Sequence, residues 1–266
     1  MTEQELRIRF IGRAKDFYGT SKGDARHKEI VEVYNSYLPH PRGYKLTNKD
    51  NWCAAFVSAI AIHCGMTGII PVECSCGEQI KLWQKMGRWE ENDKYRPRIG
   101  DLLYYDWQDS KNYANYDNKG APEHVGIVVW CIGDDILVIE GNKGNASVVG
   151  YREMNINGRY IRGFGLPDFA ALADEASEKV PDAPAAAPKN GAAVCLAELP
   201  VLAYGAKGEA VRALQALLNV RLSSVLAVDG SFGPATRAAV YEFQLDRGLD
   251  VDGSVGAETW GRLVQG

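Results

Sequence analysis

A stretch with few bulky apolar side chains, residues 170–196, divides this chain into two unequal parts. It is rich in alanine and contains three prolines. Such a segment cannot bury enough surface to offset the entropy lost on ordering, so it is typical of a semi-rigid linker. At 266 residues the chain is also long for one compact domain. We therefore predict a first domain over residues 1–169, a linker over 170–196 and a second domain over 197–266.

The composition is that of a folded globular protein and excludes several classes of partner. Apolar residues make up 46% of the chain and charged residues 24%, which is near the globular average. The net charge of -4 supplies no basic field for phosphate backbones, so we expect no nucleic-acid partner. No run approaches the roughly 18 apolar residues of a membrane-spanning helix. We therefore expect no membrane insertion, and we expect a monomer.

An internal repeat marks the second domain. Residues 228–236 read VDGSFGPAT and residues 251–259 read VDGSVGAET, and each copy leads into an apolar periodic segment. Asp-Gly supplies a turn with positive φ at the glycine, so two similar turns introduce two similar helices. A further helix precedes them, because Val211, Leu214 and Leu218 recur at helical spacing. The pattern predicts a compact three-helix domain. We expect its aromatic side chains to pack in the core: Phe232, Phe243 and Trp260.

The order of these residues resembles the three-helix peptidoglycan-binding module. The matching pattern runs from Gly208 through the two repeated turns to Leu263. The resemblance covers essentially residues 197–266 and implies that the second domain binds bacterial peptidoglycan. It assigns no individual residue to wall contact.

The first domain contains an apolar helix that begins close to a cysteine. Residues 50–65 read DNWCAAFVSAIAIHCG, with small and apolar residues on all sides, which is typical of a buried helix closed by Gly65. With Asp50 or Asn51 as the expected N-cap, Cys53 lies in the first turn. The partial positive charge of a helix N-terminus favours the thiolate there. Cys53 is therefore the candidate nucleophile.

Two apolar strands that follow are expected to form an antiparallel hairpin. The first reads HVGIVVWC from His124, and the second reads ILVIEGN and ends at Asn142. If the turn is centred near Gly133, His124 lies opposite Asn142, and Glu140 shares their face because side chains repeat every second residue. A shift of one residue would undo that facing. An earlier strand is expected over residues 97–107.

A thiolate at a helix start, a histidine on a strand and a polar partner for that histidine are the parts of a papain-like nucleophilic site. His124 would accept the thiol proton and later donate it to the leaving amine. Glu140 would hold the ring tautomer and stabilise the imidazolium, and Asn142 would share that task or contact substrate. The backbone N–H of Cys53 would donate to the oxyanion.

These segments resemble the CHAP family (cysteine, histidine-dependent amidohydrolase/peptidase) over about residues 1–168. The matching motifs are WCAAFVS, GDLLYY, HVGIV and IEGN. The family's nucleophile falls on Cys53, its base on His124, and its later polar members on Glu140 and Asn142. The resemblance implies an α+β fold, with a papain-like antiparallel sheet packed against helices, followed here by a small all-α domain.

The same resemblance implies a hydrolase that cleaves amide bonds of peptidoglycan. The bond is either the one between muramic acid and L-alanine or one within the peptide stem or bridge. A catalytic first domain with a wall-binding second domain resembles a phage or prophage endolysin. The N-terminal segment carries charges where a signal peptide needs an unbroken apolar stretch. We therefore expect synthesis in the cytoplasm and phage-mediated or lytic release onto the wall.

We expect no cofactor and no metal. A zinc site at His63–Cys64 and Cys74–Cys76 is the alternative for the other thiols, but adjacent ligands on a buried helix cannot both face one metal. Core thiols or one local disulfide are the expected states. The acidic residues that a calcium loop would use are scattered rather than alternating: Asp106, Asp109 and Asp117.

Two other functions remain open for such a chain. One is a wall-binding protein whose first domain is not catalytic, which the presence of all four polar positions disfavours. The other is a papain-type thiol peptidase acting on proteins, for which a wall-binding module has no use.

Overall fold

The computed structural model describes residues 1–92, 94–107, 120–132, 134–156, 159–173, 199–222 and 226–265. The chain divides into two compact units, Met1–Glu178 and Lys179–Gly266. Most of the predicted linker, with Cys195 in it, lies outside the described residues. Within the described ranges, no helix has both the length and the apolar character needed to cross a membrane.

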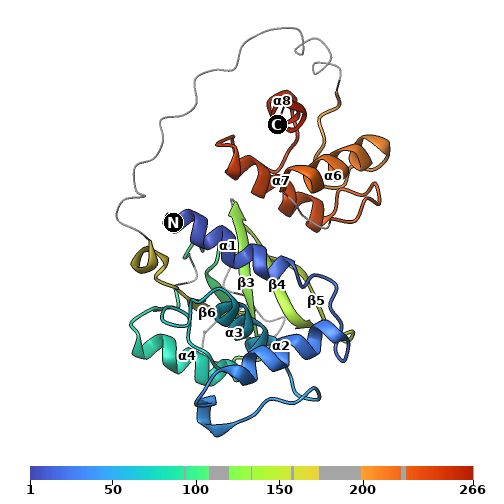
Figure 1. The fold of residues 1–266 in the computed structure, drawn as a ribbon. Coiled ribbons are helices and arrows are strands. Elements are labelled where there is room, and N and C mark those ends of the chain that lie inside the picture. Colours follow the sequence, from blue (N-terminus) through green and yellow to red (C-terminus); the bar gives the residue numbers. More distant parts are fainter. Residues whose placement is uncertain are drawn as a thin grey trace. The chain divides into compact units, whose positions relative to one another are not determined.

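The first unit packs helices against an antiparallel sheet (Figure 1). The sheet has the strand order β1-β6-β2-β3-β4-β5. Its strands are β1 (Trp89–Glu90), β2 (Leu102–Tyr105), β3 (His124–Ile132), β4 (Asp135–Lys143), β5 (Val148–Asn155) and β6 (Ile161–Gly165). The helical segments are α1 (Glu3–Lys15), α2 (Ala25–Ser36), η1 (Pro41–Gly43), α3 (Cys53–His63), α4 (Cys76–Lys85) and η3 (Phe169–Leu172).

Helix α3 is the buried helix that the sequence predicts. Residues 53–61 are all buried, and the helix contacts strands β3 and β4 as well as helices α1 and α2. A helix that is apolar on all sides has to be covered on all sides. The helix ends at His63 with Cys64 as its C-cap, and the next residue, Gly65, has a φ of 67°, which suits a left-handed helix stop. This packing fixes the start of α3 against the middle of the sheet.

The expected N-cap of α3 is wrong. The cap is Trp52, which makes no side-chain capping hydrogen bond. Asp50 does not cap the helix. Its carboxylate instead accepts hydrogen bonds from the backbone N–H and the hydroxyl of Thr47, both at 2.7 Å. Cys53 is consequently the first residue of the helix, where backbone N–H groups have no partner within the helix.

Strands β3 and β4 form the predicted antiparallel hairpin. The paired residues run from Ile132 with Asp135 to Ile127 with Ile139, and the register shifts between Val128 and Trp130. Strand β2 is shorter than the expected segment 97–107 because residues 98–101 form a turn, in which Asp101 donates its backbone N–H to the carbonyl oxygen of Arg98.

A glycine makes room for Glu140 inside this hairpin. A Cβ atom on Gly126 would lie 2.4 Å from Cγ1 of Val138 and 2.9 Å from Cγ of Glu140. Real side chains do not approach that closely, so a residue larger than glycine would push the Glu140 side chain away. Gly126 therefore belongs to the packing that positions a buried carboxylate.

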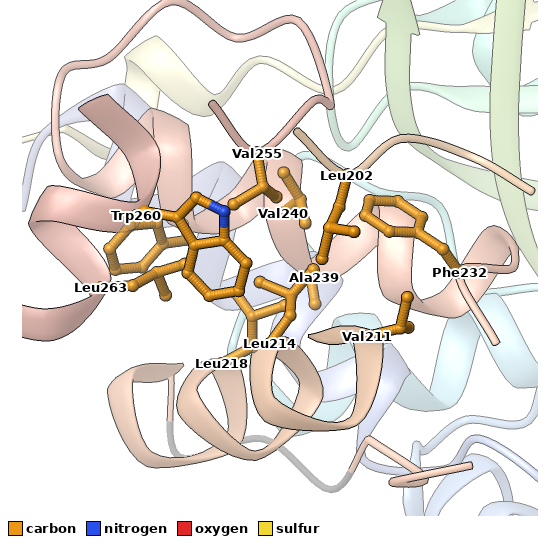
Figure 2. Close-up of a cluster of buried hydrophobic side chains, with 11 residues drawn as sticks. Leu202, Val211, Leu214, Leu218, Phe232, Ala239, Val240, Val255, Trp260 and Leu263 are labelled. Carbon is orange, nitrogen blue, oxygen red and sulfur yellow. The ribbon is translucent and has the colours of Figure 1, made fainter. Parts of the chain in front are cut away.

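The second unit is all-α. It consists of α6 (Glu209–Leu222), α7 (Pro234–Asp246) and α8 (Ala257–Gln265) around one apolar core (Figure 2). The three aromatic side chains expected in the core are each at most 2% exposed, which confirms that prediction: Phe232, Phe243 and Trp260.

Each copy of the repeated turn is built around a buried glutamine from the preceding helix. Gln215 of α6 accepts a hydrogen bond from the backbone N–H of Gly230 at 2.9 Å. Gln244 of α7 accepts the corresponding bond from Gly253 at 2.9 Å. Each glutamine also donates to an aspartate, a serine carbonyl oxygen and a threonine hydroxyl: Asp229, Ser231 and Thr236 in the first copy, and Asp252, Ser254 and Thr259 in the second. The sequence repeat is thus also a structural repeat.

Candidate active site

Cys53 lies at the N-terminus of α3 and contacts two polar side chains. Its side chain is 5% exposed and makes hydrogen bonds with Cys76 and His124. The bond from the Cys76 thiol lowers the pKa of Cys53 most, burial opposes this, and His124 lowers the pKa further. The net result is a pKa well below that of an ordinary thiol. This shift favours the thiolate of Cys53, the nucleophilic form of cysteine.

His124 lies at the start of β3 and links Cys53 to a carboxylate. Its Nε2 is 3.1 Å from Oε2 of Glu140, which leaves Nδ1 for the thiol. Burial alone would lower the pKa of His124, but hydrogen bonds to Cys53 and Glu140 outweigh it and raise the pKa to about 9. The contacts between the two side chains therefore favour a thiolate on Cys53 and an imidazolium on His124.

Glu140 is a fully buried carboxylate whose negative charge is balanced by hydrogen-bonded neighbours. Its Oε1 accepts hydrogen bonds from the Tyr105 hydroxyl at 2.5 Å and from Nε of Arg152 at 2.6 Å. Burial would raise the pKa of Glu140, but His124 and Arg152 outweigh it, so the pKa lies below the ordinary value. A buried charge is tolerable when it is paired and hydrogen-bonded in this way.

Asn142 does not join this line of side chains. Its φ of 58° and a break in register between Glu140 and Lys143 interrupt the two-residue alternation of β4. Its amide instead donates to Oδ1 of Asn51 at 3.4 Å and accepts a hydrogen bond from the hydroxyl of Ser147. Asn142 therefore lies beside the segment that leads into α3. The structure brings Cys53, His124 and Glu140 together and leaves Asn142 at the side.

The remaining thiols have separate surroundings. Cys64 approaches the carbonyl oxygen of Arg9 at 4.0 Å, and Cys74 lies 3.9 Å from Nη2 of Arg42. Among the described residues, no group of three or more His, Cys, Asp or Glu side chains is placed to hold a metal ion. Two of the aspartates considered for calcium, Asp109 and Asp117, lie outside those residues.

Comparison with known families finds one matching model within each unit. Residues 43–142 match the model of the CHAP domain, and residues 207–263 match that of the peptidoglycan binding domain. The chain combines a CHAP domain with a peptidoglycan-binding domain. The first unit has the α+β, papain-like architecture expected of a CHAP domain, and the peptidoglycan-binding domain is all-α.

Curated relatives share a short stretch with the chain. The zinc D-Ala-D-Ala carboxypeptidase of Streptomyces albus G is 44% identical over 70 residues, which is 24% of this chain and 26% of the relative. An uncharacterized protein in the bpoA1 3' region of Kitasatospora aureofaciens is 48% identical over 65 residues, which is 24% of this chain and 55% of that protein. The chain thus spans only part of each relative.

Among solved structures, the SleB N-terminal domain matches a similarly short part of the chain. It is 41% identical, with 26% of this chain and 93% of that chain covered and a TM-score of 0.25.

Two side chains of the CHAP-domain site escape sequence reasoning. Tyr105 is the last residue of the GDLLYY motif and pairs with His124 across β2 and β3. Its place in that motif is the sequence feature from which its proximity to the site could have been inferred. Arg152 lies on β5, outside the matched residues 43–142. No local pattern marks Arg152, because its contact with Glu140 depends on how β5 pairs with β4.

Proposed function

We propose that this chain is a peptidoglycan hydrolase in which Cys53 attacks an amide bond with the help of His124 and Glu140. The observation that carries the proposal is the buried, hydrogen-bonded line from thiol to imidazole to carboxylate. It occurs in a chain that also has a peptidoglycan-binding domain. That domain points to the cell wall as the substrate, because it would keep the Cys53 thiol close to peptidoglycan.

The geometry supports an acyl-transfer mechanism. The Cys53 thiolate attacks the carbonyl carbon of the amide, and the oxygen that becomes negative accepts a hydrogen bond from the backbone N–H of Cys53. The His124 imidazolium donates its proton to the leaving amine, and a thioester remains on Cys53. Water then attacks the thioester while neutral His124 accepts a proton from it. Glu140 holds the ring and stabilises its charged form throughout.

The proposal includes a role as an endolysin, a phage or prophage enzyme released onto the wall during lysis. The pairing of a CHAP domain with a wall-binding domain supports this role. The bond is an amide of the peptide part, either at muramic acid or within the stem or bridge. Mass spectrometry of fragments released from purified peptidoglycan distinguishes the two, because only the amidase frees the amino group of the first L-alanine.

The central test is Cys53→Ser, which keeps the size of the side chain but removes the thiolate. We expect loss of at least about 10³-fold in wall hydrolysis, measured by turbidity, because the nucleophile of an acyl-transfer site acts with its partners as one unit. Sedimentation with purified walls should be unchanged. Cys131→Ser, which alters a thiol on β3 outside the site, is the matched control and should retain activity.

Each alternative function has its own outcome in this test. Near wild-type hydrolysis by Cys53→Ser would remove Cys53 from the mechanism. An unaltered chain that sediments with walls and releases nothing would indicate a binding protein without catalysis. Cleavage of an unrelated protein such as casein at rates that exceed cleavage of the wall would favour the thiol peptidase.

A further inference from the structure

A second thiol lies against the candidate nucleophile. The Sγ atoms of Cys53 and Cys76 are 3.8 Å apart, and both side chains are buried. Cys53 is the first residue of α3 and Cys76 is the first residue of α4, so two helix N-termini meet at this pair. In the mechanism above only Cys53 forms a bond to the substrate, and Cys76 serves as a hydrogen-bond donor to it.

The start of α4 is attached to α3 by buried hydrogen bonds. The hydroxyl of Ser58 on α3 donates to the carbonyl oxygen of Glu73 at 2.8 Å and accepts from its backbone N–H at 3.0 Å. Gln79 on α4 approaches the same hydroxyl at 3.5 Å. In the chain, Ser58 follows Cys53 by five residues, and Gln79 follows Cys76 by three. These hydrogen bonds between α3 and the start of α4 thus hold Cys53 and Cys76 close together.

The segment that leads into Cys76 is fixed as well. The carboxylate of Glu73 accepts hydrogen bonds from the backbone N–H groups of Cys74 and Ser75, at 2.7 and 3.1 Å. Arg42 donates two further bonds to the same carboxylate, at 2.9 and 3.0 Å. Cys76 therefore has little freedom to move away from Cys53.

We propose that Cys53 and Cys76 are a site of reversible oxidation, in which exchange with a small-molecule disulfide joins them in an intramolecular disulfide that stores the nucleophile. In the first step the Cys53 thiolate attacks the reagent RSSR, which gives a Cys53–S–SR mixed disulfide and RS⁻. In the second step Cys76 attacks the Cys53 sulfur. The Cys53–S–S–Cys76 bond forms, and the second RS⁻ leaves with the proton of Cys76 as RSH.

The geometry and the other thiols favour this pair. A disulfide requires about 2.05 Å between sulfurs, so closure from 3.8 Å needs sulfur movements within the reach of side-chain rotation. The first attack selects Cys53, because burial raises the pKa of Cys64, Cys74 and Cys131 and so disfavours their reactive thiolate forms. The low pKa of Cys53 makes it the reactive thiol among them.

The test uses the full chain with Cys195→Ser as the parent, which removes the thiol outside the described residues. The reduced parent is incubated with glutathione disulfide, the excess is removed, and intact mass and peptide maps are recorded. We expect loss of two hydrogens and a cross-linked peptide that contains Cys53 and Cys76. Wall hydrolysis should fall in proportion to the cross-linked fraction and return after treatment with a thiol reductant.

Two variants of this parent locate the second step. Cys76→Ser should stop at the mixed disulfide, with one glutathione on Cys53. Cys131→Ser keeps the pair and should form the cross-link like the parent. The proposal is overturned if the parent accumulates glutathione on Cys53 without a cross-link, or if both thiols stay reduced.

The effect on hydrolysis rests on the proposed function, and the two can fail separately. If the cross-link forms and hydrolysis persists, Cys53 is not the nucleophile, whereas the oxidation site stands. If alkylation of Cys53 abolishes hydrolysis and no cross-link forms, the oxidation site alone is wrong.

Discussion

His124 should set the alkaline limit of activity. Although burial opposes it, the hydrogen bonds to Cys53 and Glu140 raise the pKa of His124 to about 9. Below this pKa the imidazolium carries the proton that the leaving amine needs, and above it the proton is lost. We expect initial rates of wall hydrolysis to be level near neutral pH and to fall as pH rises through about 9.

The same profile tests Glu140. Glu140→Gln keeps a hydrogen-bond acceptor for the ring but removes the negative charge that stabilises the imidazolium. The alkaline fall should therefore move to lower pH, and the loss of rate should be smaller than in His124→Ala. An unmoved profile in Glu140→Gln, together with inactivation by Asn142→Ala, would transfer the orienting role to Asn142.

Arg152 is expected to act as a positioning residue through Glu140. Arg152→Met keeps the length of the side chain and removes the cation 2.6 Å from the carboxylate, so burial should raise the pKa of Glu140. We expect a loss on the order of tenfold in kcat/KM, equivalent to about 1.4 kcal/mol. We also expect the fall of the rate on the acid side of the pH profile to begin at a higher pH than in the unaltered protein.

Arg152→Lys and Arg162→Met serve as controls for that prediction. Arg152→Lys retains the charge and should recover part of the rate, whereas Arg162 pairs with Glu91 and its loss should leave the profile in place. Equal activity loss at every pH in Arg152→Met, with a lowered unfolding temperature, would indicate a structural role alone.

The two glutamine-centred turns are expected to stabilise the second unit to a similar extent. Gln244→Ala removes the acceptor for the backbone N–H of Gly253 and the donor to the Ser254 carbonyl oxygen. Leaving buried backbone groups without partners should lower the free energy of unfolding by about 1–3 kcal/mol, measured by thermal unfolding of residues 179–266.

A matched surface change provides the reference for the turns. Asp250→Ala alters an exposed residue beside the second turn and should change that free energy by less than about 0.5 kcal/mol. Gln215→Ala should resemble Gln244→Ala, because both turns use the same set of bonds. If Gln244→Ala proved as mild as Asp250→Ala, the turns would not depend on the glutamines.

The chain as a whole should separate into two working parts, because each unit has its own buried core. Residues 179–266 alone should fold and sediment with purified peptidoglycan. Residues 1–178 alone should cleave the wall, more slowly than the full chain when walls are dilute. A tether raises the effective concentration of substrate, and this advantage disappears once substrate is plentiful.

Rates at two wall concentrations test this division. The full chain and residues 1–178 should differ at the low concentration and converge at the high one. Identical rates at both, with residues 179–266 left in the supernatant, would contradict a wall-targeting role for the second unit.

Local patterns in the sequence are sufficient to predict most of the fold and part of the site. Uniform apolar character predicts that α3 is buried, two apolar segments around a short turn predict the β3–β4 hairpin, and the repeated turn predicts two similar helices. Each is a property of a few consecutive residues. The same reasoning places Cys53 in the first turn of a helix and puts His124 and Glu140 on one hairpin.

The contacts that complete the site come from tertiary structure. Cys76 reaches Cys53 because buried bonds of Ser58 attach α4 to α3, and Arg152 reaches Glu140 because β5 pairs with β4. Asn142 leaves the line of side chains because its left-handed backbone ends the alternation on which the prediction depended. Such contacts join residues far apart in the chain, and no local periodicity encodes them.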